Sequence, residues 1–161
     1  MEHLWSPWRY RYISQAESAG GCIFCLKAEE RKDDTNFVLY RGKLNFAILN
    51  LYPYTTGHLM IAPYEHVPTL EQASEEALSE MMLLIRRASH YLREVYRPDG
   101  MNIGMNVGAS AGAGIAGHIH MHVLPRWSGD TNFMTTVGET RVLPEDLADT
   151  YAKLSRAFRQ A

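Results

Sequence analysis

The sequence predicts an α+β domain with a mainly antiparallel sheet of about five strands, one long central helix and a C-terminal helix. Three observations favour this fold class. Short apolar segments with β-strand character fill the middle of the 161-residue chain, one long amphipathic segment interrupts them, and a second one follows them. Strands grouped in this way, with helices beside them, are typical of antiparallel sheets rather than of alternating β/α folds.

Composition limits the class of protein. Hydrophobic residues make up 46% and charged residues 21% of the chain, as in an ordinary globular domain. The formal charge of −2 argues against nonspecific binding of nucleic-acid polymers, which needs a clustered basic surface. No apolar run could cross a bilayer, and the first residues do not resemble a secretory signal. We therefore expect a cytoplasmic protein with no membrane partner.

The chain divides into an expected N-terminal arm, residues 1–21, and a single domain, residues 22–161, which includes a C-terminal helical extension. The arm holds an aromatic and basic cluster. Its members are Trp5, Trp8, Arg9, Tyr10, Arg11 and Tyr12. Such a cluster could pack on the body or on a second subunit, or it could stack on bases.

Strands are expected at 37–40, 45–50 and 58–62, where short apolar runs are bounded by polar residues and by Pro and Gly. A fourth strand is expected at 101–107, where apolar residues alternate with Asn and Gly, beside a fifth strand at 118–124.

One long helix should run from about Ser74, a suitable N-cap, to Tyr96. Apolar residues recur in it at intervals of three and four, which predicts a buried stripe in which Met is core filler. The stripe consists of Leu78, Met81, Met82, Ile85, Ala88, Leu92 and Val95.

A last helix is expected to hold Pro144 in its first turn. Its buried face would consist of Leu147, Tyr151, Leu154 and Phe158.

Histidine alternates strictly with large apolar residues between His118 and Leu124. Because side chains alternate along a strand, His118, His120 and His122 would project from one face, roughly 7 Å apart. A lone strand histidine is usually a half-buried hydrogen-bonding residue. Three at alternate positions suit a metal or a phosphate chain.

The segment 108–117 directly before the histidines is rich in Gly and Ala. Such a loop lets the backbone approach a ligand and can turn N–H groups toward an anion. It lacks the Gly-Lys-Ser/Thr ending of a P-loop, which excludes a Walker-type ATPase.

Cys22 and Cys25 have the spacing of a metal-ligand pair, but they supply only half a site. The same gap occurs in redox dithiols, and the pair could simply pack. Zinc would need two more ligands from among seven histidines. His3 and His90 are poor candidates, since the first is terminal and the second lies in the long helix.

The run His-Ile-His-Met-His-Val-Leu at 118–124 resembles the signature of the histidine triad (HIT) superfamily, whose members act on nucleoside phosphates. The resemblance covers about Cys22 to Met134. Segment 50–61 resembles the nucleoside-binding segment of the family. Segments 112–115, 125–127 and 129–134 are similar to the branch with a Cys-x-x-Cys entry and diadenosine polyphosphate substrates. The resemblance to this superfamily implies a HIT-like fold and, commonly, a homodimer in which two sheets join.

The resemblance also implies catalytic roles. His120 would attack an α-phosphorus and form a nucleotidyl-histidine, and a largely neutral imidazole can do so without a separate base. His122 and His58 would contact the phosphate, where N–H donors meet developing charge.

Further residues would bind the substrate. Asn50 would bind the ribose, while Ile48 and Leu51 would line the base pocket, although they could equally be sheet core. The set is completed by Asn106, the backbone of Gly112, and Gly114.

In zinc-bearing relatives the first triad histidine joins the Cys pair and a histidine after the third strand. The matching set here would be a closed, structural zinc site. It consists of Cys22, Cys25, His66 and His118.

One departure from the pattern bears on the reaction. Other HIT branches usually place Gln-Ser or Gln-Thr where this chain has Gly114 and Ile115. The departure favours the diadenosine polyphosphate branch, some of whose members use phosphate rather than water. We therefore expect a nucleotide hydrolase or phosphorylase, that is, a nucleotidyltransferase.

Three alternatives stay open: a nucleoside phosphoramidase, a weakly active nucleotide-sensing protein, and a purely metal-binding protein. Arg126, Trp127 and Asp130 could contact substrate or simply order the chain after the triad strand.

Overall fold

The computed structural model describes residues 21–138, 140 and 142–159, so the aromatic cluster of the arm lies outside the described residues. Five strands form one antiparallel sheet in the order β1-β2-β3-β5-β4. They are β1 (Val38–Arg41), β2 (Asn45–Leu49), β3 (Leu59–Pro63), β4 (Gly100–Met105) and β5 (Met121–Arg126). The sheet and its helices confirm the predicted α+β class.

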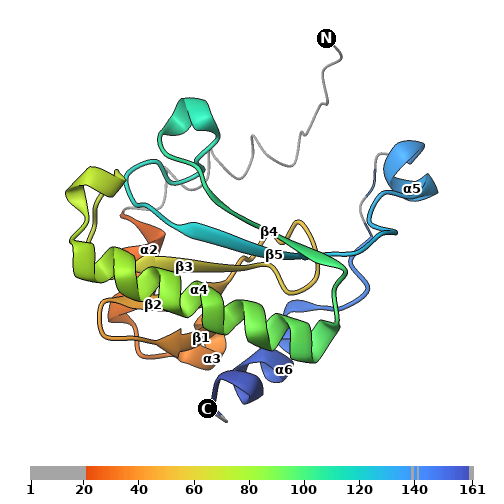
Figure 1. Cartoon of the computed structure of the whole chain (residues 1–161), viewed down its shortest axis with the longest axis horizontal. Coiled ribbons are helices and arrows are strands. Elements are labelled where there is room, and N and C mark those ends of the chain that lie inside the picture. The colour runs from red at the N-terminus through yellow and green to blue at the C-terminus, as the bar shows by residue number, and fades with distance from the viewer. Residues whose placement is uncertain (1–20, 139, 141, 160–161) are drawn as a thin grey trace.

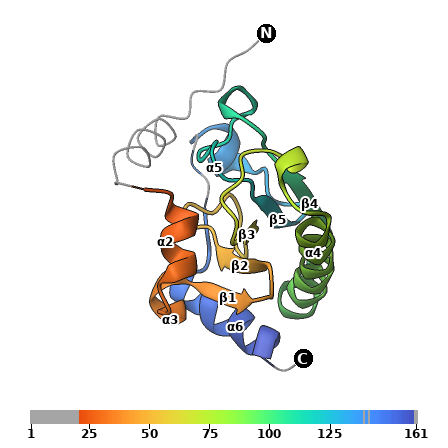
Figure 2. The ribbon, with the colours of Figure 1, turned by 90° about the vertical axis from the view of Figure 1, so that its left-hand side faces the viewer.

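Helices lie on both faces of the sheet. They are α2 (Ile23–Glu29), α3 (Asp33–Asn36), α4 (Glu75–Tyr96), α5 (Phe133–Thr136) and α6 (Leu147–Arg159), with short 3-10 helices η1 (Leu70–Gln72) and η2 (Ala109–Ala111). Helix α4 crosses one face, and Figure 2 shows α2 on the opposite side of the sheet (Figures 1 and 2). Within the described residues, no helix combines the length and apolar character that a bilayer crossing requires.

The long helix α4 begins as predicted, because the Ser74 hydroxyl accepts a hydrogen bond from the N–H of Ala77 at 3.2 Å. Most of the predicted stripe faces the sheet. The buried residues of that prediction are Met81, Ile85, Ala88 and Leu92. The prediction for Met82 is wrong: it is 58% exposed, and Leu84 is buried instead. At 100° per residue, Met82 lies on the side turned away from the sheet.

Alternate strand residues supply two cores. Leu49, Leu59 and Val123 pack with α4 and α6 on one face. On the other face Phe24 of α2 packs on a cluster that includes Ile48. Ile48 and Met60, which alternate with Leu49 and Leu59 along the chain, therefore point toward α2.

The prediction that Pro144 lies in the first turn of the last helix is wrong, because α6 begins at Leu147. Asp146 caps it: its side chain accepts a hydrogen bond from the N–H of Asp149 at 2.8 Å. The predicted apolar face is confirmed, since Leu154 and Phe158 are fully buried.

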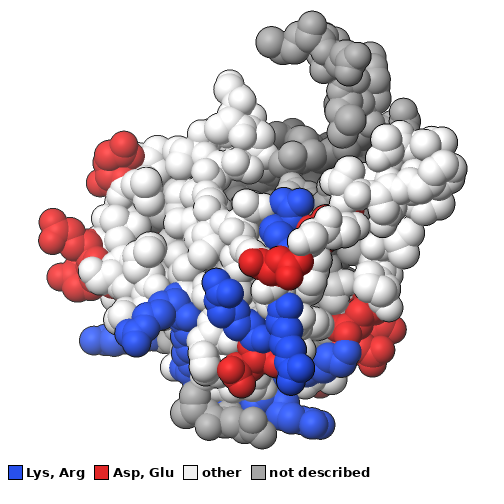
Figure 3. Space-filling view, turned by 45° about the vertical axis from the view of Figure 1, so that its right-hand side comes forward, with Lys and Arg blue, Asp and Glu red and all other residues white. Residues whose placement is uncertain are grey.

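Charges of both signs lie at the end of the sheet nearest α5 and α6. Figure 3 shows Lys and Arg side chains interleaved with Asp and Glu over the lower half of this face. Interleaved charges are the ordinary arrangement of a solvated surface.

Candidate active site and metal centre

The predicted strand at 118–124 is displaced, because β5 begins only at Met121. The β3–β5 ladder ends at the pair Ile61–Met121. The N–H of Ile119 then donates to the carbonyl of Val67 at 2.8 Å. Residues 64–66 therefore loop out of the ladder, and His118 and His120 precede the strand rather than belong to it.

This loop brings the four predicted metal ligands together. Sγ of Cys22 lies 3.3 Å from Nδ1 of His118, and Sγ of Cys25 lies 3.3 Å from Nδ1 of His66. The ligand atoms of all four residues lie within 4.8 Å of one another. Two sulfurs and two imidazole nitrogens thus converge on one point.

The donor set fits a tetrahedral cation. With Zn–S bonds of about 2.3 Å and Zn–N bonds of about 2.0 Å, a tetrahedron places sulfur and nitrogen ~3.5 Å apart. The observed separations are 3.3 Å and, between Cys25 and His118, 3.7 Å. Nε2 of His118 lies 2.9 Å from the carbonyl of Pro63, so it donates there and Nδ1 keeps its lone pair for a cation.

The Cys25 thiol keeps its proton at neutral pH unless a cation displaces it. Burial, followed by the hydrogen bond with Cys22, raises the pKa of Cys25 to about 11. A bound cation would be what holds this sulfur as a thiolate, because a metal ligand must be deprotonated.

His120 is held in one tautomer. Its Nδ1 lies 2.9 Å from the carbonyl oxygen of His118, which can only accept, so Nδ1 carries the hydrogen and Nε2 keeps its lone pair. The ring packs on Phe24 at 4.8 Å between centroids and is 4% exposed. Burial lowers the pKa of His120, so the ring is neutral at pH 7, as nucleophilic attack requires.

His58 and His122 form a second ordered pair. The N–H of Tyr54 donates to Nδ1 of His58 at 3.2 Å, so the hydrogen of His58 is on Nε2, 2.9 Å from Nδ1 of His122. His122 then carries its own hydrogen on Nε2, the donor that suits a phosphate oxygen. Burial, then repulsion from His122 and His120, lowers the pKa of His58 to about 2.

The three triad rings lie on one side of the chain, but more closely than an extended strand would place them. The centroids of His120 and His122 are 4.9 Å apart, against the roughly 7 Å expected between alternate strand residues. His118 turns toward the cysteines, so the triad divides between the candidate metal ligands and the two histidines predicted to be catalytic.

A cavity of about 220 Å³ is lined by Phe24, which packs on His120, and by Asn50, which lies against His58. Ile48 and Leu51, the residues predicted for a base pocket, line it together with Asn50, and Ile48 also belongs to the core. Oδ1 of Asn50 accepts the N–H of Tyr52 at 2.9 Å, and its Nδ2 lies 3.4 Å from Nδ1 of His58.

Sequence reasoning missed the wall of this cavity that α2 supplies. Ile23, Leu26 and Lys27 line it from that helix, and Ile115 lines it from the glycine loop. The three-residue spacing of Ile23 and Leu26 was the available signal, although seven residues are too few for a clear helical period.

The remaining predicted substrate contacts lie around the loop between β4 and β5. Gly112 has a left-handed φ of 90°, which favours glycine, and its N–H donates to the carbonyl of Ala109 at 2.9 Å. That donor is therefore engaged within the loop. Asn106 directly follows Met105, whose pairing with Met121 is the last of the β4–β5 ladder. Gly114 is half-buried between Gly112 and the triad.

Arg126 and Asp130 order the chain after β5. Nε of Arg126 donates to Oδ2 of Asp130 at 2.5 Å, and the N–H of Trp127 donates to the same oxygen at 3.2 Å. Nη1 of Arg126 also binds Oδ1 of Asn102 on the neighbouring strand.

The sequence model of the HIT domain matches residues 31–129. AP-4-A phosphorylase from Mycobacterium tuberculosis is 40% identical over 157 residues, which cover 93% of this chain and 80% of that protein. Bis(5'-nucleosyl)-tetraphosphatase [asymmetrical] from Schizosaccharomyces pombe is 32% identical over 93 residues, 58% of this chain and 50% of that protein.

A zinc-bound histidine triad family protein from Mycobacterium smegmatis has a similar structure. Its TM-score is 0.71 at 30% identity, and the match covers 87% of this chain and 94% of that one. The chain therefore belongs to the histidine triad (HIT) family, within the branch that carries a Cys-x-x-Cys pair.

Proposed function

We propose that this protein cleaves dinucleoside polyphosphates such as diadenosine tetraphosphate at an α-phosphate through a covalent nucleotidyl-His120. The observation that carries the proposal is that hydrogen bonds fix the tautomers of the histidines. His120 keeps a lone pair on Nε2, and the contact with His58 leaves His122 with an N–H donor at Nε2. A neutral nucleophile beside an N–H donor is what displacement at a phosphate needs. The names of the relatives support this substrate class.

The reaction would take two displacements. Nε2 of His120 forms a bond to the α-phosphorus while the bond from that phosphorus to the bridging oxygen breaks, and the rest of the substrate leaves as a nucleoside polyphosphate. His122 donates a hydrogen bond to the oxygen that gains charge. Water or inorganic phosphate then attacks the same phosphorus, and Nε2 of His120 takes back its electron pair.

The cavity lined by Ile48 and Leu51 would hold the base, and Asn50 would bind the ribose hydroxyls. Asn106 and the loop with Gly112 and Gly114 would surround the phosphate chain. The N–H of Gly112 can bind a phosphate only if its hydrogen bond to the carbonyl of Ala109 breaks.

The metal centre would hold a structural zinc ion. Four protein ligands leave no open position for a substrate, so this chain's own histidines would carry the chemistry. The zinc-bound relative and the sulfur–nitrogen separations support this assignment.

A homodimer is also proposed. β4 lies at the edge of the sheet, and Ile103 on it is 48% exposed. Met82 and Leu83 on α4 are 58% and 61% exposed. A second copy that continued the sheet would cover these side chains. A mass of one chain in solution at micromolar concentration, measured by light scattering, would contradict this.

The product pattern from diadenosine tetraphosphate, measured with and without inorganic phosphate, tests the proposed reaction. AMP plus ATP in both conditions identifies a hydrolase. ADP plus ATP only with phosphate identifies a phosphorylase. If neither pair forms, the proposal fails, and turnover of adenosine phosphoramidate would then separate a phosphoramidase from a nucleotide-sensing protein.

A further inference from the structure

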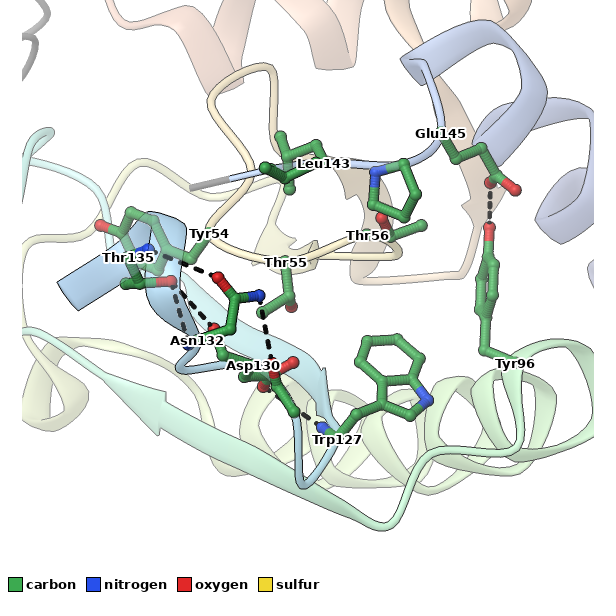
Figure 4. A pocket seen from close by; sticks show the side chains of 13 residues that line it. Tyr54, Thr55, Thr56, Tyr96, Trp127, Asp130, Asn132, Thr135, Leu143 and Glu145 are labelled. Carbon is green, nitrogen blue, oxygen red and sulfur yellow. Dashed lines mark hydrogen bonds between the residues drawn. The ribbon is translucent and has the colours of Figure 1, made fainter. Parts of the chain in front are cut away.

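A second cavity lies at the end of the sheet (Figure 4). Its volume of about 460 Å³ is twice that of the cavity beside Asn50, and it lies in the ~300–1,000 Å³ range of small-molecule sites. Its walls come from residues 54–56, from five residues between Trp127 and Thr135, from residues 142–145 and from Tyr96 at the end of α4. Four separate parts of the chain thus meet around it.

Tyr54 connects this cavity with the histidines. Its ring lines the cavity and lies 4.9 Å from the ring of His58 and 6.3 Å from that of His122, between centroids. A molecule bound in the cavity would be separated from the catalytic pair by a single aromatic side chain. The two sites are therefore close enough for one extended ligand to occupy both.

The lining of the second cavity suits an uncharged aromatic group. Tyr54, Tyr96 and Trp127 contribute rings, and those of Tyr96 and Trp127 meet edge to face at 6.4 Å. None of the described residues that line it is Lys, Arg or His, and its charged members are Asp130 and Glu145. Each carboxylate pairs with a cation outside this lining, Asp130 with Arg126 and Glu145 with Lys153. The described lining therefore offers rings and polar groups, and no cation for a phosphate chain.

Both carboxylates are held in place. Asp130 binds Arg126 and the backbone of Trp127, and Oε1 of Glu145 accepts the Tyr96 hydroxyl at 2.6 Å. Figure 4 shows Trp127 and Asp130 on one side of the cavity, with Leu143 on the other. The pocket is thus built from ordered groups, with an indole on one wall and an aliphatic side chain opposite.

We propose that the second cavity binds the second nucleoside of a dinucleoside polyphosphate, with Trp127 as its stacking surface. This inference rests on the proposed function, since it concerns the part of that substrate that leaves with the polyphosphate. The smaller cavity beside Asn50 would hold the nucleoside whose phosphorus is attacked. Trp127 would thereby favour substrates with two nucleosides over those with one.

The test is a pair of binding measurements in the His120→Ala background, which prevents turnover. The ligands are diadenosine tetraphosphate and AMP. Adding Trp127→Ala should weaken dinucleotide binding at least about fivefold, the factor expected for one lost base–aromatic stack, and leave AMP binding within about twofold. Trp127→Phe, which keeps an aromatic face, should lose less.

Leu143→Trp, which fills the cavity from the opposite wall, provides an independent test if Trp127→Ala does not fold. It should also weaken dinucleotide binding selectively. An equal loss for both ligands, or unchanged dinucleotide binding in the variants, would overturn the assignment. Failure of the proposed function has a different signature: the unaltered protein would bind the dinucleotide more tightly than AMP and yet cleave it in neither condition.

Discussion

The carbonyl oxygen of His118 lies 2.9 Å from Nδ1 of His120. The main chain of a candidate metal ligand therefore sets the tautomer of the proposed nucleophile two residues later. The His118 ring is itself held at both nitrogens, by Pro63 on one side and by the two cysteines on the other. A structural ion at this point would stabilise the conformation in which Nε2 of His120 is presented, without taking part in the reaction.

Replacing His120 with Ala should lower turnover of diadenosine tetraphosphate by at least about a thousandfold, because the covalent route is lost. Nucleotide binding should be largely retained, since the base cavity is untouched. Steady-state kinetics and equilibrium binding of AMP check the two halves. His90→Ala on the exposed side of α4 is a matched control that should behave as the unaltered protein does. Retained activity in His120→Ala would refute the mechanism.

Stability should depend on pH through His58. Its pKa is about 2 in the folded protein and about 6.5 when unfolded, so unfolding takes up a proton below pH 6.5. Its stabilising contribution is complete above that pH and is lost as pH falls toward 2. The slope from this residue is at most ~1.4 kcal/mol per pH unit.

Urea unfolding between pH 7 and pH 4 measures this slope. His58→Gln keeps a polar side chain of similar size but cannot titrate, so its free energy of unfolding should depend less steeply on pH. Other acid-sensitive groups, the cysteines included, are common to both proteins and cancel in the difference. Parallel curves for the two proteins would contradict the assignment.

The first three strands were predictable to within about one residue because each is a short apolar run that ends at polar residues, Gly or Pro, whereas β5 begins three residues later than predicted. The start of α4 was predictable for a similar local reason, since Ser74 precedes a clear helical period. These signals lie in neighbouring residues. They need no knowledge of what packs against them.

The features that sequence could not give depend on contacts between distant residues. His58 meets His122 only because β3 and β5 are neighbours in the sheet. The loop at residues 64–66 breaks the ladder, and no local pattern marks that break. The burial of Phe24 against two histidines likewise comes from the docking of α2, a helix too short to be recognised from its period.

Metal analysis should find about one zinc per chain in the unaltered protein. Changing Cys22 and Cys25 together to Ser should remove it and lower the unfolding temperature, because binding by the folded state alone stabilises that state. Ser89→Ala on α4, far in sequence from the ligands, is a control substitution that should keep the metal. Metal-free protein with an unchanged unfolding temperature would contradict a structural ion.

Gly57 fixes the backbone conformation directly before His58, which precedes β3. Its φ is +80°, and a Cβ there would lie 3.1 Å from side-chain atoms of both Leu92 and Tyr96. Gly57→Ala should therefore lower the free energy of unfolding by about 1–3 kcal/mol, because strain and crowding add. The same change at Gly100, where a Cβ meets nothing within 4 Å, should have a much smaller effect. Urea denaturation of the two variants compares them directly. Since Gly57 precedes His58, Gly57→Ala should also lower the turnover of the folded protein. Equal turnover in the two glycine variants would show that the His58–His122 contact does not depend on this backbone conformation.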